Sequence, residues 1–81
     1  MTYQQEIIKE YENQGFTVLK IIRLNKSGYP DLMCLKDGKV IFIEVKEEKD
    51  NLKELQKKRI KELKQLGFDA FCMQKNKGKI Y

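Results

Sequence analysis

The chain has 81 residues and a formal net charge of +5 at pH 7, and it contains no histidine. Its two cysteines, Cys34 and Cys72, match no zinc-ligand spacing and are too few for a disulfide framework, so zinc-finger and disulfide-rich classes are excluded. No apolar run reaches the length of a membrane span, and the polar N-terminus does not resemble a secretory signal.

These features indicate one small domain, residues 1–81, in the cytoplasm (the host's cytoplasm if a phage encodes it). We expect both cysteines to be buried, reduced thiols. The excess of positive charge favours a polyanionic partner such as nucleic acid. A domain of this size buries only about 60–65% of the surface that its unfolded chain exposes, so we also expect a homodimer.

The first predicted element is a helix from residue 2 to about residue 14, because Tyr3, Ile7 and Tyr11 recur at every fourth position. Residues 16–24 are rich in β-branched and apolar side chains and predict a strand. A loop follows at residues 25–28, and the proline beyond it disfavours helix there.

A hairpin comes next, because the apolar runs 31–35 and 40–46 flank Asp37-Gly38, a dipeptide typical of type I′ turns. A helix over roughly residues 50–66 and a last strand over residues 69–74 complete the chain, and the basic tail has little to bury. The order α-β-β-β-α-β predicts an α/β fold with a mixed sheet flanked by helices.

The second strand of the hairpin carries two charges in an otherwise apolar run. Its side chains alternate between faces, so Glu44 and Lys46 share a face with Phe42, while Ile41, Ile43 and Val45 occupy the other. Charge on a central strand is costly unless it is paired or binds a metal ion. Taken alone, the two residues are also compatible with an ion pair at the solvated end of the strand.

Asp31 strengthens the metal interpretation. Facing residues of the hairpin have numbers that sum to about 75, which places Asp31 opposite Glu44. Two facing carboxylates repel each other, so we expect a cation between them. Oxygen ligands without histidine favour a hard divalent ion, Mg²⁺ or Mn²⁺. The alternative for Asp31 is a simple turn residue after proline.

Two polar residues of the second helix fall within its apolar arc, which consists of Leu52, Leu55, Ile60, Leu63 and Leu66. Gln56 needs a partner there, either the carboxylate cluster or a nearby backbone group. Arg59 could extend out of the arc and meet a phosphate. Elsewhere, Glu6 and Glu10 flank the apolar stripe of the first helix, and their periodicity alone is typical of solvated charges.

The motif residues resemble the PD-(D/E)XK nuclease superfamily, and within it the VRR-NUC domain. The resemblance covers nearly the whole chain and rests on an ordered set of motifs: Ser27-Gly28-Tyr29-Pro30-Asp31-Leu32, Ile43-Glu44-Val45-Lys46, Leu52-x-x-Leu55-Gln56 and Leu66-Gly67. Tyr29 stands where this family often has a smaller residue. The N-terminal part also resembles archaeal Holliday-junction resolvases.

This resemblance implies a restriction-endonuclease-like core and a set of metal ligands. Asp31, Glu44 and the backbone carbonyl of Val45 would hold the catalytic metal. Glu6, in the family's first-helix acidic position, would contact the metal through water. The helix is shorter than in many members, so Glu10 remains an alternative for that position.

The resemblance also implies the reaction. Lys46 would orient and help deprotonate the attacking water or stabilise charge on the phosphate, and Gln56 would belong to the active-site wall. We therefore expect an Mg²⁺- or Mn²⁺-dependent endonuclease, using one or two metal ions, that hydrolyses Holliday junctions or other branched DNA. Lysines of the second helix would contact the DNA backbone without reading bases: Lys53, Lys57, Lys58, Lys61 and Lys64.

Two other classes of function remain open. The chain could be a module that grips branched nucleic acid without cutting it, although binding alone does not call for a carboxylate pair beside a polyanion. It could also be a structural protein whose acidic pair is a plain ion-pair network, in which case Mn²⁺ would not change its thermal stability. An RNA substrate is compatible with the sequence as well.

Overall fold

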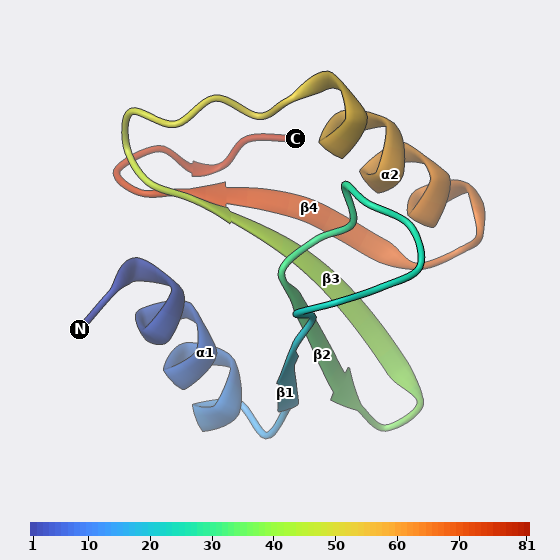
Figure 1. The fold of residues 1–81 in the computed structure, drawn as a ribbon. Coiled ribbons are helices and arrows are strands. Elements are labelled where there is room, and N and C mark those ends of the chain that lie inside the picture. The colour runs from blue at the N-terminus through green and yellow to red at the C-terminus, as the bar shows by residue number, and fades with distance from the viewer.

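The computed structural model describes residues 1–81 and contains two helices and a five-stranded sheet (Figure 1). The sheet order is β1-β2-β3-β4-β5, with β3 and β4 parallel and the other neighbours antiparallel. The expected mixed sheet flanked by helices is confirmed. The elements are α1 (Tyr3–Asn13), β1 (Thr17–Lys20), β2 (Leu32–Lys36), β3 (Lys39–Lys46), α2 (Glu54–Gln65), β4 (Asp69–Gln74) and β5 (Gly78–Lys79).

The helices begin and end at local signals in the sequence. Thr2 and Gln5 form a capping box at the start of α1, each side chain bonding the other's backbone N–H. Gly15 and Gly67, with φ of +95° and +96°, follow the ends of α1 and α2, where a left-handed residue is favoured. Neither helix is long and apolar enough to cross a membrane.

The hairpin has the predicted register. Leu32 pairs with Ile43 and Cys34 with Ile41, so facing residue numbers sum as expected. Asp37 and Gly38 both have positive φ, 50° and 76°, as a type I′ turn requires. Alternate side chains of β3 therefore face α1 and α2 in turn.

Three element boundaries differ from the sequence prediction. β1 stops at Lys20 because the chain turns away into a loop of residues 21–29, whose base closes through a bond from the Ile21 N–H to the Asp31 carbonyl. α2 starts at Glu54 instead of near residue 50, because polar contacts hold residues 47–50 as an irregular loop. The tail adds the short strand β5 on the edge of β4.

The core consists of two layers on opposite faces of the sheet. The α1 side buries a cluster of six apolar side chains: Ile7, Leu32, Cys34, Ile41, Ile43 and Phe71. The α2 side buries a smaller cluster: Ile60, Leu63, Ala70 and Cys72, with Phe42 packed against it. Both cysteines are buried and free, as expected. Glu44 belongs to the face covered by α2.

Candidate active site

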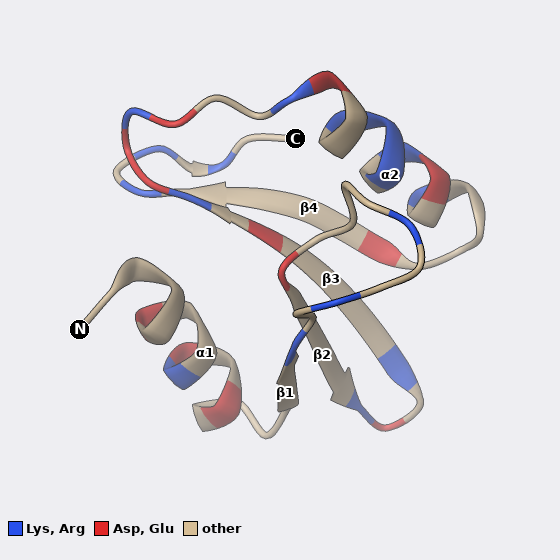
Figure 2. Cartoon of the chain, in the orientation of Figure 1, with Lys and Arg blue, Asp and Glu red and all other residues tan.

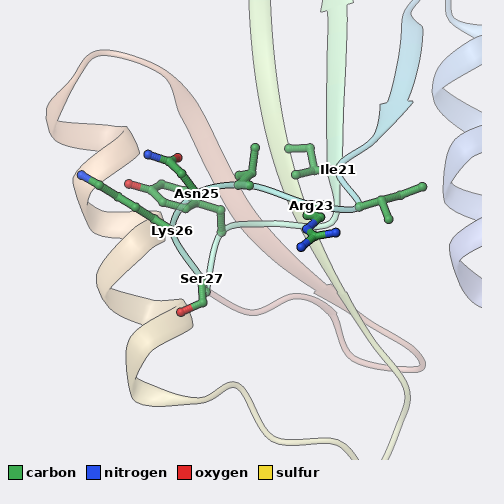
Figure 3. Close-up of a pocket in the computed structure, with 9 residues that line it drawn as sticks. Ile21, Arg23, Asn25, Lys26 and Ser27 are labelled. Carbon is green, nitrogen blue, oxygen red and sulfur yellow. The ribbon is translucent and has the colours of Figure 1, made fainter.

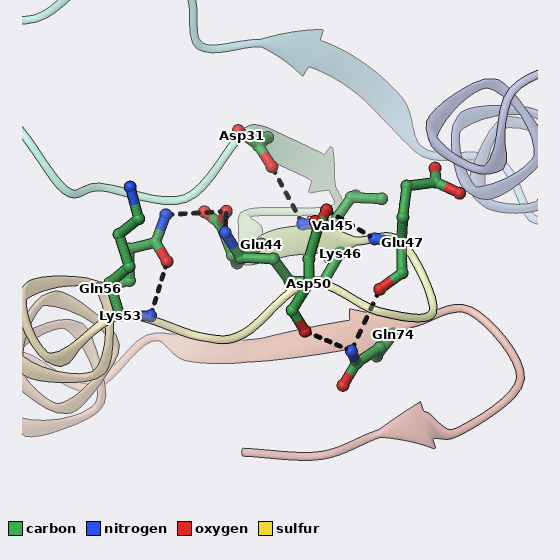
Figure 4. Close-up of polar contacts among 9 residues, drawn as sticks. All are labelled: Asp31, Glu44, Val45, Lys46, Glu47, Asp50, Lys53, Gln56 and Gln74. Atoms are coloured by element: carbon green, nitrogen blue, oxygen red, sulfur yellow. Dashed lines mark hydrogen bonds and ion pairs between the residues drawn. The ribbon is translucent and has the colours of Figure 1, made fainter.

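Glu44 is the centre of the polar group that the fold buries. It lies on β3 between Ile43 and Val45 and is only 3% exposed. Its Oε2 atom accepts a hydrogen bond from Gln56 Nε2 at 3.2 Å and lies 3.5 Å from Lys46 Nζ (Figure 4). Its Oε1 atom is buried and has no hydrogen-bond partner.

Asp31 approaches the same strand from the end of the loop that precedes β2. Its Oδ2 atom accepts a hydrogen bond from the Val45 N–H at 3.0 Å (Figure 4). This bond holds the Asp31 carboxylate beside β3 just before the regular ladder with β2 begins. The structure therefore brings Asp31 and Glu44 together from residues far apart in the sequence.

Lys46 lies two residues beyond Glu44, on the same face, and its side chain is 12% exposed. It is the only cation paired with Glu44. A mostly shielded ammonium beside two carboxylates interacts with them, and with any incoming anion, more strongly than it would in water.

Gln56 connects α2 to the carboxylate cluster. Its Nε2 donates to Glu44, and its Oε1 accepts from the Lys53 N–H at 3.0 Å, at the N-terminus of the helix (Figure 4). Both partners considered from the sequence, the cluster and a nearby backbone group, are therefore present at once. The glutamine fixes the orientation of Glu44 relative to the start of α2.

Burial raises the pKa of Glu44 from 4.5 to about 7; the negative charge of Asp31 adds to the rise, and Lys46 opposes it. A carboxyl group with such a pKa binds a cation in exchange for its proton near neutral pH.

The unpartnered Oε1 atom of Glu44 indicates whether Glu44 and Asp31 suit a metal ion. Buried polar atoms in native proteins nearly always have a partner, and a divalent cation between Glu44 and Asp31 would satisfy this oxygen. No third acidic, histidine or cysteine side chain joins them in a group that could hold a metal ion. Two carboxylates suit Mg²⁺ or Mn²⁺, since such ions keep several water ligands and also bind substrate phosphates. The donor set therefore fits a hard divalent cation.

Glu6 and its alternative Glu10 are not among the residues that contact Asp31, Glu44 or Lys46 through a hydrogen bond or ion pair. Glu6 is on α1, which covers the opposite face of the sheet, and neither Glu6 nor Glu10 forms a side-chain hydrogen bond or ion pair. Both lie close enough to Tyr3 to contribute to its raised pKa, after the effect of burial. A water-mediated contact of Glu6 with a metal stays a prediction.

The sequence suggested that Arg59 extends away from the helix to meet a phosphate, but in the structure its guanidinium contacts other residues of the protein. Its Nε donates to the Ser27 carbonyl at 3.0 Å, its guanidinium stacks over the Tyr29 ring at 4.8 Å, and it pairs with Glu62. Gly28 lies so close to α2 that an added Cβ would be 2.6 Å from Leu55 Cγ. These contacts fix the loop that leads to Asp31.

The sequence reasoning missed Gln74. This buried residue pairs with Lys46 in the sheet, and its Nε2 contacts the carbonyls of Glu47, Glu48 and Asp50 at 3.0, 3.1 and 2.6 Å (Figure 4). It thereby holds the segment that follows β3. The available signal was a polar side chain two residues after Cys72, on the inward face of a strand.

Comparison with known proteins agrees with this geometry. The family model of the VRR-NUC domain matches residues 3–76. A solved structure described as a VRR_NUC domain has 28% identity and a TM-score of 0.74, covering 85% of this chain and 76% of that one.

A second solved structure is Hjc, a Holliday junction resolvase from the archaeal hyperthermophile Archaeoglobus fulgidus. It has 19% identity and a TM-score of 0.67, over 88% of this chain and 65% of that one, which shows a shared fold. A search of curated proteins finds no significant match. The family match over most of the chain shows that this chain belongs to the VRR-NUC family of the PD-(D/E)XK nuclease superfamily.

Proposed function

We propose that residues 1–81 form a metal-dependent endonuclease domain that hydrolyses phosphodiester bonds in DNA, with a preference for Holliday junctions or other branched structures. The observation that carries the proposal is the buried Glu44 carboxylate. One of its oxygens is held by Gln56 and Lys46, while the other has no partner and stands beside Asp31. Membership of the VRR-NUC family supports the same class of reaction.

The residues that would hold the cation are Asp31, Glu44 and the carbonyl of Val45, with Glu6 as a candidate for a contact through water. Mg²⁺ or Mn²⁺ bound there would supply Lewis-acid chemistry, polarising the scissile phosphate and lowering the pKa of a water. Gln56 keeps the Glu44 carboxylate in one orientation, so that its free oxygen stays directed into the site.

Lys46 has the second role in the reaction. Its ammonium is mostly shielded from solvent, so its attraction for a phosphate oxygen is stronger than that of a surface lysine. It orients the attacking water and stabilises the charge that builds on the phosphate as the P–O bond to the leaving oxygen breaks. Replacing it with alanine removes that charge and leaves the carboxylates in place.

The charge distribution indicates the side from which DNA approaches. α1 carries three glutamates, Glu6, Glu10 and Glu12, and one lysine, whereas α2 carries five Lys or Arg residues and two glutamates (Figure 2). Of the lysines on and next to α2, only Lys57 has an ion-pair partner, Glu54. The basic face therefore lies on the α2 side of the sheet, the side that also holds Glu44. Unpaired surface lysines suit contacts to phosphates without base recognition.

The fold shared with the archaeal resolvase supports the proposed preference for branched DNA. A homodimer would present two such sites to opposed strands of a four-way junction. We expect this activity in the cytoplasm, where thiols such as the buried Cys34 and Cys72 remain reduced.

The test is cleavage of labelled four-way junction, flap, single-stranded and linear duplex DNA with Mg²⁺ or Mn²⁺. Wild type is compared with Asp31→Ala and Lys46→Ala, and with Lys39→Ala, which removes an exposed lysine from the other end of the same strand. We expect metal-dependent cleavage that falls at least about 10²–10³-fold in the first two variants and persists in Lys39→Ala. Light scattering on the same samples measures the oligomeric state.

A thermal shift with Mn²⁺ separates the alternatives. Mn²⁺ should raise the melting temperature of wild type and not that of a variant lacking both Asp31 and Glu44 carboxylates. If wild type binds branched DNA but cuts nothing with either metal, the chain is a non-catalytic binding module. If Mn²⁺ also leaves wild type unchanged, the acidic pair is a structural network and the nuclease proposal fails.

A further inference from the structure

The loop of residues 21–29 presents a surface that the proposed mechanism does not use. The loop is closed at its base by the bond of 2.7 Å from the Ile21 N–H to the Asp31 carbonyl. Its far end is fixed to α2 through Arg59, which bonds the Ser27 carbonyl, and through Gly28, which packs against Leu55. The loop is therefore held in place directly beside a candidate metal ligand.

The middle of this loop exposes apolar side chains. Ile22 is 89% exposed and Leu24 is 51% exposed. Residues 21–29 also surround a hollow of about 440 Å³, from which their side chains splay in different directions (Figure 3). A hollow of this size falls in the range of pockets that accept small organic groups. The loop thus combines an exposed apolar side chain, Ile22, with an adjacent hollow that can accept a small organic group.

The charges of the loop are all positive. Arg23 lies between Ile22 and Leu24, Lys26 follows in the same loop and Lys20 precedes it, and residues 13–30 contain no aspartate or glutamate. None of these three cations forms an ion pair. The loop therefore complements a ligand that offers both an apolar face and negative charge.

We infer that this loop reads the branch point of DNA: Ile22 packs against a base left unstacked there, and Arg23 and Lys26 contact the flanking phosphates. Apolar side chains that enter a base step must unstack it, and this costs least where pairing is already interrupted. A branch point next to the scissile bond meets that condition, whereas continuous duplex does not. The inference rests on the proposed function, because it names how that site selects its substrate.

A second copy of the chain suits this surface less well. In a symmetric dimer the same patch meets itself, which would set the unpaired cations of one loop against those of the other. DNA instead supplies the opposite charge for each of them. The homodimer proposed above would use another face of the molecule.

The experiment uses the full chain and a four-way junction that carries 2-aminopurine at the branch point, where its fluorescence rises as the base unstacks. Wild type, Ile22→Ser and Arg23→Gln are compared with Leu66→Ser, which changes an exposed leucine (73%) at the end of α2. Fluorescence is read in EDTA, so it does not depend on cleavage. The ratio of junction cleavage to linear duplex cleavage is then measured with Mg²⁺.

We expect wild type and Leu66→Ser to raise the fluorescence, and Ile22→Ser to lose the rise and to lower the cleavage ratio by about tenfold, the effect of losing one apolar packing contact. Arg23→Gln should weaken binding to every DNA and reduce its salt dependence.

An equal signal in Ile22→Ser and wild type would overturn the inference. So would conversion of a dimer to a monomer by Ile22→Ser, since the loop would then be a self-association surface. Failure of wild type to cut any DNA would instead refute the proposed function, while the signal in EDTA still tests the loop.

Discussion

On the α1 side of the sheet the buried side chains are all apolar, whereas on the α2 side a carboxylate and a glutamine are buried among them. The α1 layer is larger and contains Ile41, Ile43 and Phe71 of the strands. The α2 layer contains small side chains on β4, Ala70 and Cys72, and Cys72 pairs with Glu44 across the parallel ladder.

This difference separates the source of stability from the source of chemistry. An apolar layer gains free energy from every buried side chain, while a buried carboxylate with an unpartnered oxygen loses some. Lys46 and Gln56 offset part of that loss through their contacts with one oxygen of Glu44, and they leave the other oxygen for a ligand. Substitutions on the two faces should therefore have opposite profiles of stability and activity.

The largest effect on stability should come from the α1 layer. Ile7→Ala removes a side chain that is 2% exposed and should lower the free energy of unfolding by roughly 2–5 kcal/mol, as measured by urea denaturation. Cleavage per folded molecule should stay the same, because Ile7 lies on the opposite face from Glu44. Leu66→Ala, on the surface, should change stability by less than about 0.5 kcal/mol. If Ile7→Ala kept its stability but lost cleavage, the assignment of stability to the α1 face and of chemistry to the α2 face would be wrong.

The next effect is the pH dependence that Glu44 confers in the absence of metal. Its pKa is about 7 in the folded protein against 4.5 ordinarily, so between these values the folded state binds more protons than the unfolded state. The free energy of unfolding should therefore be highest below pH 4.5 for this group and fall as pH rises toward 7, by about 3 kcal/mol at most. Urea denaturation from pH 5 to 8 in EDTA measures this slope.

Glu44→Gln provides the control for that slope. The neutral amide has no proton to lose, so this variant should show a flatter profile and greater stability than wild type at pH 8. The same steep profile in both proteins would mean that another group causes it.

A smaller effect is expected where the loop meets α2. Gly28 has φ of +86°, and a Cβ there would lie 2.6 Å from Leu55 Cγ. Gly28→Ala should cost about 1–3 kcal/mol of backbone strain and also lower cleavage, because it displaces the loop that carries Asp31. Gly67→Ala is the matched control: its φ is similar, +96°, but nothing lies within 4 Å. Equal cleavage in the two variants would show that the loop does not position Asp31.

The smallest change in stability should come from Gln56, where two substitutions separate two roles. Gln56→Met removes both hydrogen bonds and should cost about 1 kcal/mol, whereas Gln56→Glu keeps an acceptor for the Lys53 N–H and the stability of the cap. The added carboxylate should raise the pKa of Glu44 further, so the pH optimum of cleavage should move upward only in Gln56→Glu. Identical pH profiles for the two variants would mean that Gln56 does not act through Glu44.

The sequence by itself determined the layout of the hairpin and its charged face. Strand side chains alternate strictly, and Asp37-Gly38 sets the turn, so the register and the shared face of Asp31, Glu44 and Lys46 follow from local rules. The family motifs then predicted the kind of site, and the element order predicted the mixed sheet.

Only the tertiary structure decided how the site is held. Glu44 is buried, with a raised pKa, because α2 and β4 close over it, and these elements are remote from it in sequence. The three carbonyl contacts of Gln74 and the bond of Arg59 to the loop each join segments that are remote in sequence, so only the folded structure shows them. The side of the sheet that α1 covers was decided in the same way: a helix's periodicity specifies which of its sides packs, but the face of the sheet that it covers depends on the whole fold.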